Sequence, residues 1–93
     1  MFVVVYKIKD LGIVKHLNDY CKSIGEVQEP FSQCLFVDAP SLNQNVLSES
    51  IADIVGLNGC FLVSQTNATE CYGRMGVKAA SWLQSKRDAK LGK

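Results

Sequence analysis

The single histidine of the chain, His16, stands where its neighbours could support acid–base chemistry. Asp19 and Tyr20 follow it at positions i+3 and i+4 of an amphipathic stretch, so the three side chains can share one face of a helix. A histidine paired with a carboxylate is half of an acid–base device. No serine or cysteine stands nearby in the sequence to act as a nucleophile, and an exposed helical histidine explains the pattern more simply.

The cysteines are the second chemical candidate, at Cys21, Cys34, Cys60 and Cys71. None forms a Cys-x-x-Cys pair and one histidine cannot complete a ligand set, so we predict no metal site. Cys34 and Cys60 lie inside apolar runs, which is typical of small buried hydrophobic residues. The even count permits disulfides, but no secretory signal accompanies it, and we therefore expect free thiols.

Two further patterns carry little chemistry. Glu26 and Glu29 are close in sequence, but they fall on a weak strand that contains Pro30. The segment 73–76 (Gly-Arg-Met-Gly) places two glycines and a cation before a predicted helix, where an anion could bind. A tight turn explains the same residues. We therefore predict no catalytic residue and no cofactor, and the balance leans away from an enzyme.

Length and composition limit the class of protein. The chain has 93 residues, 47% of them hydrophobic, and a formal net charge of +1. These values predict one globular domain and exclude a disordered chain or a bulk neutraliser of nucleic acid. The sequence contains neither a signal-peptide pattern nor an apolar run long enough to span a membrane. We expect a cytoplasmic protein with no membrane partner.

The apolar periodicity predicts seven elements in the order strand, helix, strand, strand, helix, strand, helix. Asp10 is the expected cap of the first helix, and Ser41 with Gln44 is the expected capping box of the second. The predicted strands are Phe2–Ile8, Glu26–Phe31, Cys34–Val37 and Cys60–Val63, and the predicted helices are about Ile13–Ile24, Ser41–Val55 and Val77–Arg87. This order predicts an α+β protein, a ferredoxin-like βαββαβ sandwich with an additional C-terminal helix. We expect a single domain over 1–85 and a basic C-terminal tail over 86–93.

The strands are apolar on both faces, whereas a sheet covered on one side alternates apolar and polar residues. Two helices cover one face, so the other face needs a partner. We predict a homodimer whose interface draws on six strand residues: Val3, Val5, Leu35, Val37, Phe61 and Val63. The alternative is a monomer in which the third helix closes the second face, although a ten-residue helix spans only about 15 Å.

The charge is uneven along the chain. Residues 1–69 hold four basic and seven acidic side chains, for −3, and residues 70–93 hold six basic and two acidic, for +4. One interpretation is a surface that binds nucleic acid or an acidic protein. The candidate partner-binding residues are Lys7, Arg74, Lys78, Lys86 and Arg87. The other interpretation is a solvated helix face whose cations lie favourably near its C-terminus.

Four short segments together resemble one known family. They are 3–6 (Val-Val-Val-Tyr), 24–27 (Ile-Gly-Glu-Val), 32–37 (Ser-Gln-Cys-Leu-Phe-Val) and the spaced set Tyr72-Gly73, Gly76 and Ala80-Ser81-Trp82-Leu83. Over roughly residues 2–85, their order and spacing resemble the SinR-like small proteins. These are relatives of the CRISPR-associated integration endonuclease and of VapD-type ribonuclease toxins. The resemblance implies a ferredoxin-like fold and a homodimer.

The sequence departs from this family at one important residue. In the endonuclease branch an aspartate follows the aromatic end of the first strand and is thought to help hold a divalent metal. The matching position here is Lys7, and an ammonium group cannot ligate a metal. Asp10 lies three residues further on and is a poor substitute. We therefore do not carry the nuclease activity over.

Three functions are compared. The favoured one is a non-catalytic, dimeric interaction module that binds a protein or nucleic-acid partner. The alternative is a metal-dependent nuclease related to the CRISPR-associated integration endonuclease, which rests on resemblance in fold. A further alternative is a small-molecule sensor domain, since ligands often bind at domain interfaces.

Overall fold

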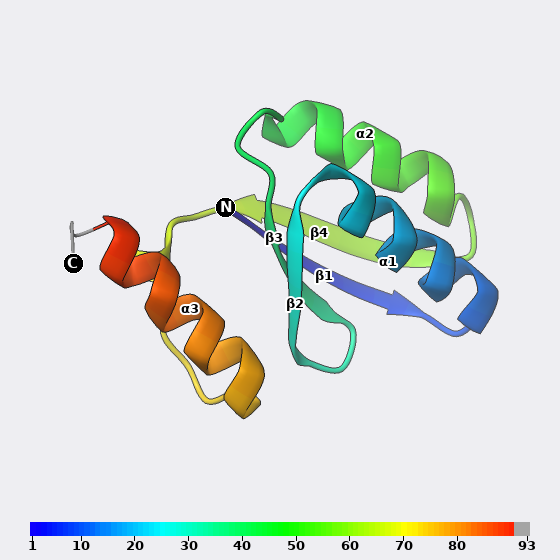
Figure 1. The fold of residues 1–93 in the computed structure, drawn as a ribbon. Coiled ribbons are helices and arrows are strands. Elements are labelled where there is room, and N and C mark those ends of the chain that lie inside the picture. Colours follow the sequence, from blue (N-terminus) through cyan, green and yellow to red (C-terminus); the bar gives the residue numbers. More distant parts are fainter. Residues whose placement is uncertain (91–93) are drawn as a thin grey trace.

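The computed structural model describes residues 1–90, which follow the order strand, helix, two strands, helix, strand, short 3₁₀ helix and helix (Figure 1). The α+β class predicted from the sequence is confirmed. The strands are β1 (Phe2–Ile8), β2 (Glu26–Phe31), β3 (Cys34–Asp38) and β4 (Gly59–Gln65). The helices are α1 (Leu11–Ile24), α2 (Gln44–Val55) and α3 (Val77–Lys90), with a short 3₁₀ helix, η1, at Ala68–Glu70.

The strands form one antiparallel sheet in the order β2-β3-β1-β4. β1 is central, so Val4 lies opposite Leu35 of β3 on one side and opposite Val63 of β4 on the other. The register of β2 shifts after Gln28, just before Pro30. A proline cannot donate a ladder hydrogen bond, and its position agrees with the place of β2 at an edge of the sheet.

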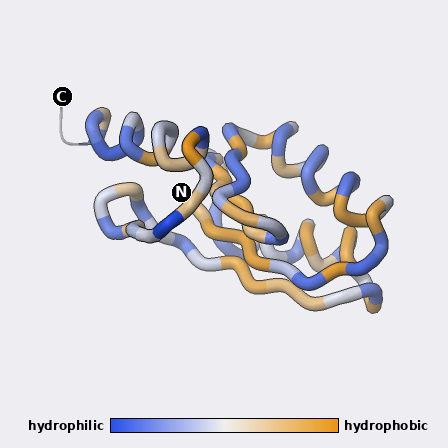
Figure 2. The backbone as a smooth tube through the Cα atoms, turned by 90° about the horizontal axis from the view of Figure 1, so that it is seen from below, coloured by the Kyte–Doolittle hydropathy of each residue, from blue (hydrophilic) through white to orange (hydrophobic). Residues whose placement is uncertain are grey.

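One face of the sheet holds the main core, beneath α1 and α2, which lie side by side (Figure 1). Every second residue of β1 points into this core and is almost fully buried, namely Phe2, Val4, Tyr6 and Ile8. α1 and α2 contribute buried leucines, isoleucine and valine from one stripe each, at Leu17, Leu47, Ile51 and Val55. Each such side chain contributes about 1.5–3 kcal/mol when it leaves water. Figure 2 shows the resulting pattern along the backbone, with largely orange strands and with helices that alternate between orange and blue.

The two helix starts illustrate how capping works in this chain. Asp10 caps α1 as predicted, since its carboxylate accepts hydrogen bonds from the backbone N–H groups of Gly12 and Ile13. The predicted capping box at Ser41 is wrong. α2 begins at Gln44, and its cap is Asn43, whose side-chain oxygen accepts from the backbone N–H of Val46 at 2.9 Å.

α3 is longer than the sequence pattern predicted and extends to Lys90. Residues 86–90, predicted to belong to a basic tail, are therefore the last turns of this helix, and no structural boundary separates them from 1–85. The remainder of the predicted tail, 91–93, lies outside the described residues. α3 lies apart from α1 and α2, on the other side of the sheet (Figure 1).

Within residues 1–90, none of the helices combines the length and the apolar character that crossing a membrane requires.

Candidate interaction surface on the second sheet face

The second face is the side of the sheet that points away from α1 and α2. Its side chains alternate with those of the main core along each strand. In register, Val3 of β1 lies opposite Phe36 of β3, and Val5 lies opposite Leu62 of β4. We describe the second face as two halves. One half lies over β2 and β3 and includes Val3 at the start of β1, and the other lies over the rest of β1 and over β4.

The covered half lies beneath α3. Its central residue, Phe36, is only 4% exposed. The indole ring of Trp82 stacks on it with a centroid distance of 6.1 Å and an interplanar angle of 12°, an offset arrangement favoured by aromatic pairs. Leu83 of α3 and Ala68 of η1 complete this second, smaller hydrophobic cluster, against which Val3 also packs.

A polar cluster fastens the C-terminal part of α3 to the strands. The Nζ of Lys86 lies 2.9 Å from a carboxylate oxygen of Glu26 and 2.8 Å from one of Asp38. The indole N–H of Trp82 donates to the same Glu26 carboxylate at 2.9 Å. The hydrogen bonds from Lys86 and then Trp82 lower the pKa of Glu26, while Asp38 and Glu26 raise the pKa of Lys86.

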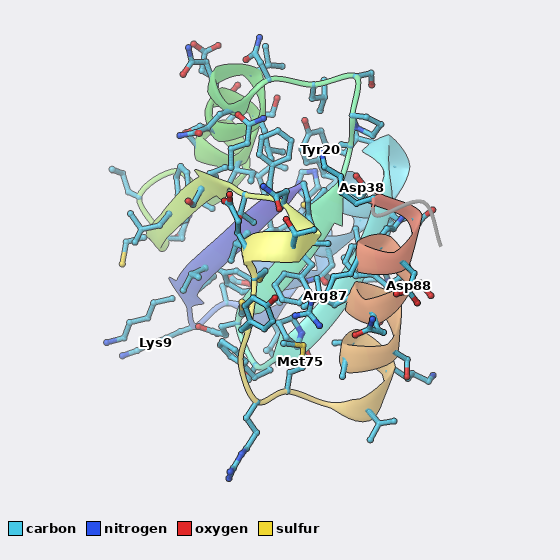
Figure 3. The ribbon with its side chains drawn as sticks, turned by 90° about the vertical axis from the view of Figure 1, so that its left-hand side faces the viewer. Lys9, Tyr20, Asp38, Met75, Arg87 and Asp88 are labelled. Carbon is cyan, nitrogen blue, oxygen red and sulfur yellow. The ribbon has the colours of Figure 1, made fainter. Side chains whose placement is uncertain are left out.

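Arg87 holds the connection between β4 and α3. Its guanidinium donates to the backbone carbonyl oxygens of Ala68, at 2.9 Å, and of Cys71. It also lies over the ring of Tyr72, 4.4 Å from the centroid, within the range of a cation–π interaction. Figure 3 shows Arg87 pointing from α3 toward this connection, whereas Lys9 points away from the body of the protein at the other end of the sheet.

The open half, by contrast, has no helix over it. We use this name for Val5 and Lys7 of β1 together with Cys60 and Leu62 of β4, all of which are exposed. Val5 is 42% exposed and Leu62 is 73% exposed. These four side chains line a shallow cavity of about 270 Å³. Lys7 is the only charged residue among them, so the surface is mainly apolar.

The open half continues into a free strand edge. The backbone N–H of Tyr6 donates to Gln33, and the backbone N–H and C=O of Ile8 bond to the Gln33 side chain. The even-numbered residues of β1 therefore bond toward β3, and its odd-numbered residues bond toward β4. It follows from the register that Gly59, Phe61, Val63 and Gln65 point their backbone groups outward, at the edge of the sheet.

The five predicted partner-binding cations do not form one surface. Lys7 lies in the open half, while Arg74 and Lys78 are exposed around the start of α3. Lys86 and Arg87 are engaged in the internal contacts described above. Two of the five therefore stabilise the position of α3.

The six predicted interface residues also divide. Val3 and Val5 lie on the second face. Leu35 and Val37 are fully buried in the main core, and Phe61 and Val63 pack against it, beneath the helices. A second chain has no access to Leu35 or Val37 in this structure. Leu62 is exposed on the second face but is not among the six predicted residues. The signal that identifies it is the alternation along β4 together with its position opposite Val5.

The chemical candidates are not assembled into a reactive site. Asp19 bonds to Lys15 at 2.6 Å, which lowers the pKa of Asp19, and His16 is exposed. The backbone N–H of Gly76, at the suspected anion site, donates to the carbonyl of Pro30. Among residues 1–90, no three His, Cys, Asp or Glu side chains gather as a metal site would need.

All four cysteines are free. Burial raises the pKa of the Cys21 thiol to about 11, and burial also raises that of Cys34. The prediction of a buried Cys60 is wrong, because the alternation of β4 turns this side chain to the uncovered part of the second face, where it is exposed.

Comparisons of the chain with protein-family models, with curated proteins and with solved structures found no match. The resemblance to the SinR-like proteins therefore stays a prediction.

Proposed function

We propose that this chain is a non-catalytic, homodimeric interaction module with a ferredoxin-like fold, and that its interaction surface is the open half together with the edge of β4. One observation carries the proposal. β4 is an edge strand of seven residues with no charge and no proline, and its most prominent side chain, Leu62, is 73% exposed. Edge strands normally carry charged residues, a proline, a bulge or a covering segment, any of which prevents association with another chain.

The topology supports the ferredoxin-like part of the proposal. A split βαβ arrangement places the two strands of each β-α-β unit on either side of a strand from the other unit. Here β3 lies between β1 and β2, and β1 lies between β3 and β4. α1 and α2 also pack on the same face, as that arrangement requires.

The character of the surface favours protein over nucleic acid as the partner. Single-stranded nucleic acid binds to grooves that combine several cations with aromatic platforms. The open half offers aliphatic Val5 and Leu62 with one cation, Lys7, and two of the other predicted cations are already paired. A second copy of the chain is the simplest protein that fits, because β4 has no like charges to repel its own copy.

The test is the mass of the protein in solution, measured by light scattering over a range of concentrations. We expect a mass near twice 10.2 kDa that falls toward the monomer on dilution. Leu62→Asp places a charge in the interface and is expected to give a monomer at every concentration. Leu57→Asp is the matched control, because Leu57 is even more exposed than Leu62 but lies in the turn before β4, and it is expected to leave the dimer intact.

Two outcomes would overturn the proposal. The first is a wild-type mass that stays at the monomer value throughout. The second is a dimer that Leu62→Asp and Leu57→Asp weaken equally, since the association would then not involve β4. Circular dichroism of both variants establishes that each one is folded.

A further inference from the structure

The outward backbone groups of β4 limit how two copies can meet. In an antiparallel pair, residues that exchange hydrogen bonds lie directly opposite one another. The outward groups belong to the odd-numbered residues 59–65, so an odd-numbered residue must face an odd-numbered residue of the second copy. The two residue numbers in every facing pair then add up to one fixed even number.

Full overlap of the two strands selects one register from this set. If Gly59 faces Gln65 of the partner copy, the pairs continue inward through Phe61 facing Val63. The two-fold axis then passes between the two copies of Leu62. A register shifted by two residues makes three such bonded pairs instead of four, so the full-length register makes the most hydrogen bonds.

We infer that two copies of this chain join β4 to β4 in antiparallel fashion, in the register centred on Leu62, and so form one continuous sheet. This inference rests on the proposed function and specifies its partner and geometry. At the axis, Leu62 meets its own copy in a non-hydrogen-bonded pair, where side chains approach most closely. The Leu62 side chain, which is 73% exposed, thereby gains a further apolar neighbour.

The charges within β1 and β4 do not oppose this register. Lys7, the only charged residue of these two strands, lies opposite Cys60 on the neighbouring strand. Strand spacing and rise place the two Lys7 residues about 14 Å apart across the sheet and about 14 Å along it, hence about 20 Å from each other. This exceeds the screening length of about 8 Å at physiological salt.

One side chain partly occupies the edge in the single chain. The Nε2 of Gln44, at the start of α2, lies 3.5 Å from the carbonyl oxygen of Val63. This distance is long for a hydrogen bond, and Gln44 is exposed and free to turn away. The pairing requires this carbonyl to accept from Phe61 of the second copy instead.

Disulfide trapping tests the register. Cysteines can be bridged when their Cα atoms lie about 4.4–6.8 Å apart, and facing residues near a two-fold axis meet this condition. In a chain that carries Cys60→Ser and Cys71→Ser, Leu62→Cys is expected to form a covalent dimer with oxidised glutathione. In that reaction two thiols become one interchain disulfide, and the oxidant is reduced to two molecules of glutathione.

The matched control is Val5→Cys in the same background. Val5 lies on the same face and opposite Leu62 within one chain, but in the proposed dimer its two copies are about 14 Å apart across the sheet. We expect no covalent dimer from this variant. Ser64→Cys in a chain that keeps Cys60 is a second variant that is expected to form a covalent dimer, because Ser64 faces Cys60 of the other copy in this register. This variant still tests the register if Leu62→Cys does not fold.

The outcomes separate this inference from the proposed function. A monomeric wild-type chain overturns both. A dimer by light scattering in which Val5→Cys is trapped and Leu62→Cys is not means that the open halves meet face to face, so the edge pairing is wrong and the homodimer stands. Covalent dimers of the wild type through Cys60 alone mean a register centred on Cys60, which also overturns the inference.

Discussion

The two halves of the second face have the same alternating strand pattern, but one is buried and the other is exposed. Phe36 and Val5 both point away from the main core, yet Phe36 is 4% exposed and Val5 is 42% exposed. The difference lies in α3, which reaches the half over β2 and β3 and leaves the half over β1 and β4 free (Figure 1). A helix of 14 residues is about 21 Å long but only about 10 Å wide, so it cannot cover a sheet of this width.

The position of α3 depends on polar contacts that the open half lacks. Glu26 and Asp38 stand on β2 and β3 and hold Lys86 between them. The strands β1 and β4 offer no carboxylate between Phe2 and Ile8 or between Gly59 and Gln65. α3 therefore binds the covered half through ion pairs as well as through apolar contacts. The open half offers a partner only apolar contacts and free backbone groups.

Truncation of the two residues gives the largest expected contrast. Phe36→Ala removes a buried ring beneath Trp82 and is expected to lower the free energy of unfolding by about 3–5 kcal/mol. Val5→Ala removes partly exposed methyl groups and is expected to cost less than about 1 kcal/mol. Urea unfolding followed by circular dichroism measures both. Similar losses for the two variants would mean that the halves are equally covered in solution.

The sequence was sufficient to predict the elements because their signals are local. The alternation in β1 and the helical stripe ending at Ile24 each depend on residues within a few positions of one another. The sequence does not distinguish Asn43 as the cap of α2, because Ser41 carries the same capping chemistry two residues earlier. The turn in which the N–H of Leu42 donates to Ala39 occupies that position instead.

The candidate surface was harder to predict because its contacts join distant parts of the chain. The sequence pattern places Lys86 in a basic tail, since its partners Glu26 and Asp38 lie far away in the sequence. The six predicted interface residues include both faces of the sheet, because the alternation within one strand does not show which residues of another strand share its face. Only the register between strands, with Val5 opposite Leu62, shows which residues of different strands share a face.

Trp82 separates the apolar contribution of α3 from its polar contribution. Trp82→Ala loses both the stacking on Phe36 and the hydrogen bond to Glu26, and the expected loss of stability is about 2 kcal/mol because the ring is only half-buried. Trp82→Phe loses the hydrogen bond but keeps an aromatic ring over Phe36, so its loss of stability is expected to be smaller. Urea unfolding of the two variants measures both losses of stability. Equal losses in Trp82→Ala and Trp82→Phe would show that stacking contributes little.

Acid is expected to weaken the covered half and not the open half. The pKa of Glu26 is lowered by its hydrogen bonds from Lys86 and then Trp82, so its contribution to folding is present at neutral pH. It is lost as the pH falls below the ordinary value of 4.5 and through the lowered one. Trp82 fluorescence against pH measures the release of α3. Glu26→Gln is the control, and an identical acid transition in that variant would exclude Glu26 as the cause.

Gln44 gives the smallest expected effect and bears only on the open half. If two copies pair along β4, the side chain that lies 3.5 Å from the Val63 carbonyl oxygen competes with the second copy for that acceptor. The contact is long and exposed, so its loss in Gln44→Ala is expected to tighten the dimer by about twofold, the equivalent of a weak hydrogen bond.

Asn45→Ala is the control, because Asn45 is an exposed amide on the next position of the same helix. Dilution series by light scattering compare the two variants. A Gln44→Ala dimer weaker than that of Asn45→Ala would mean that Gln44 itself contacts the second copy, so that α2 takes part in the association along with β4.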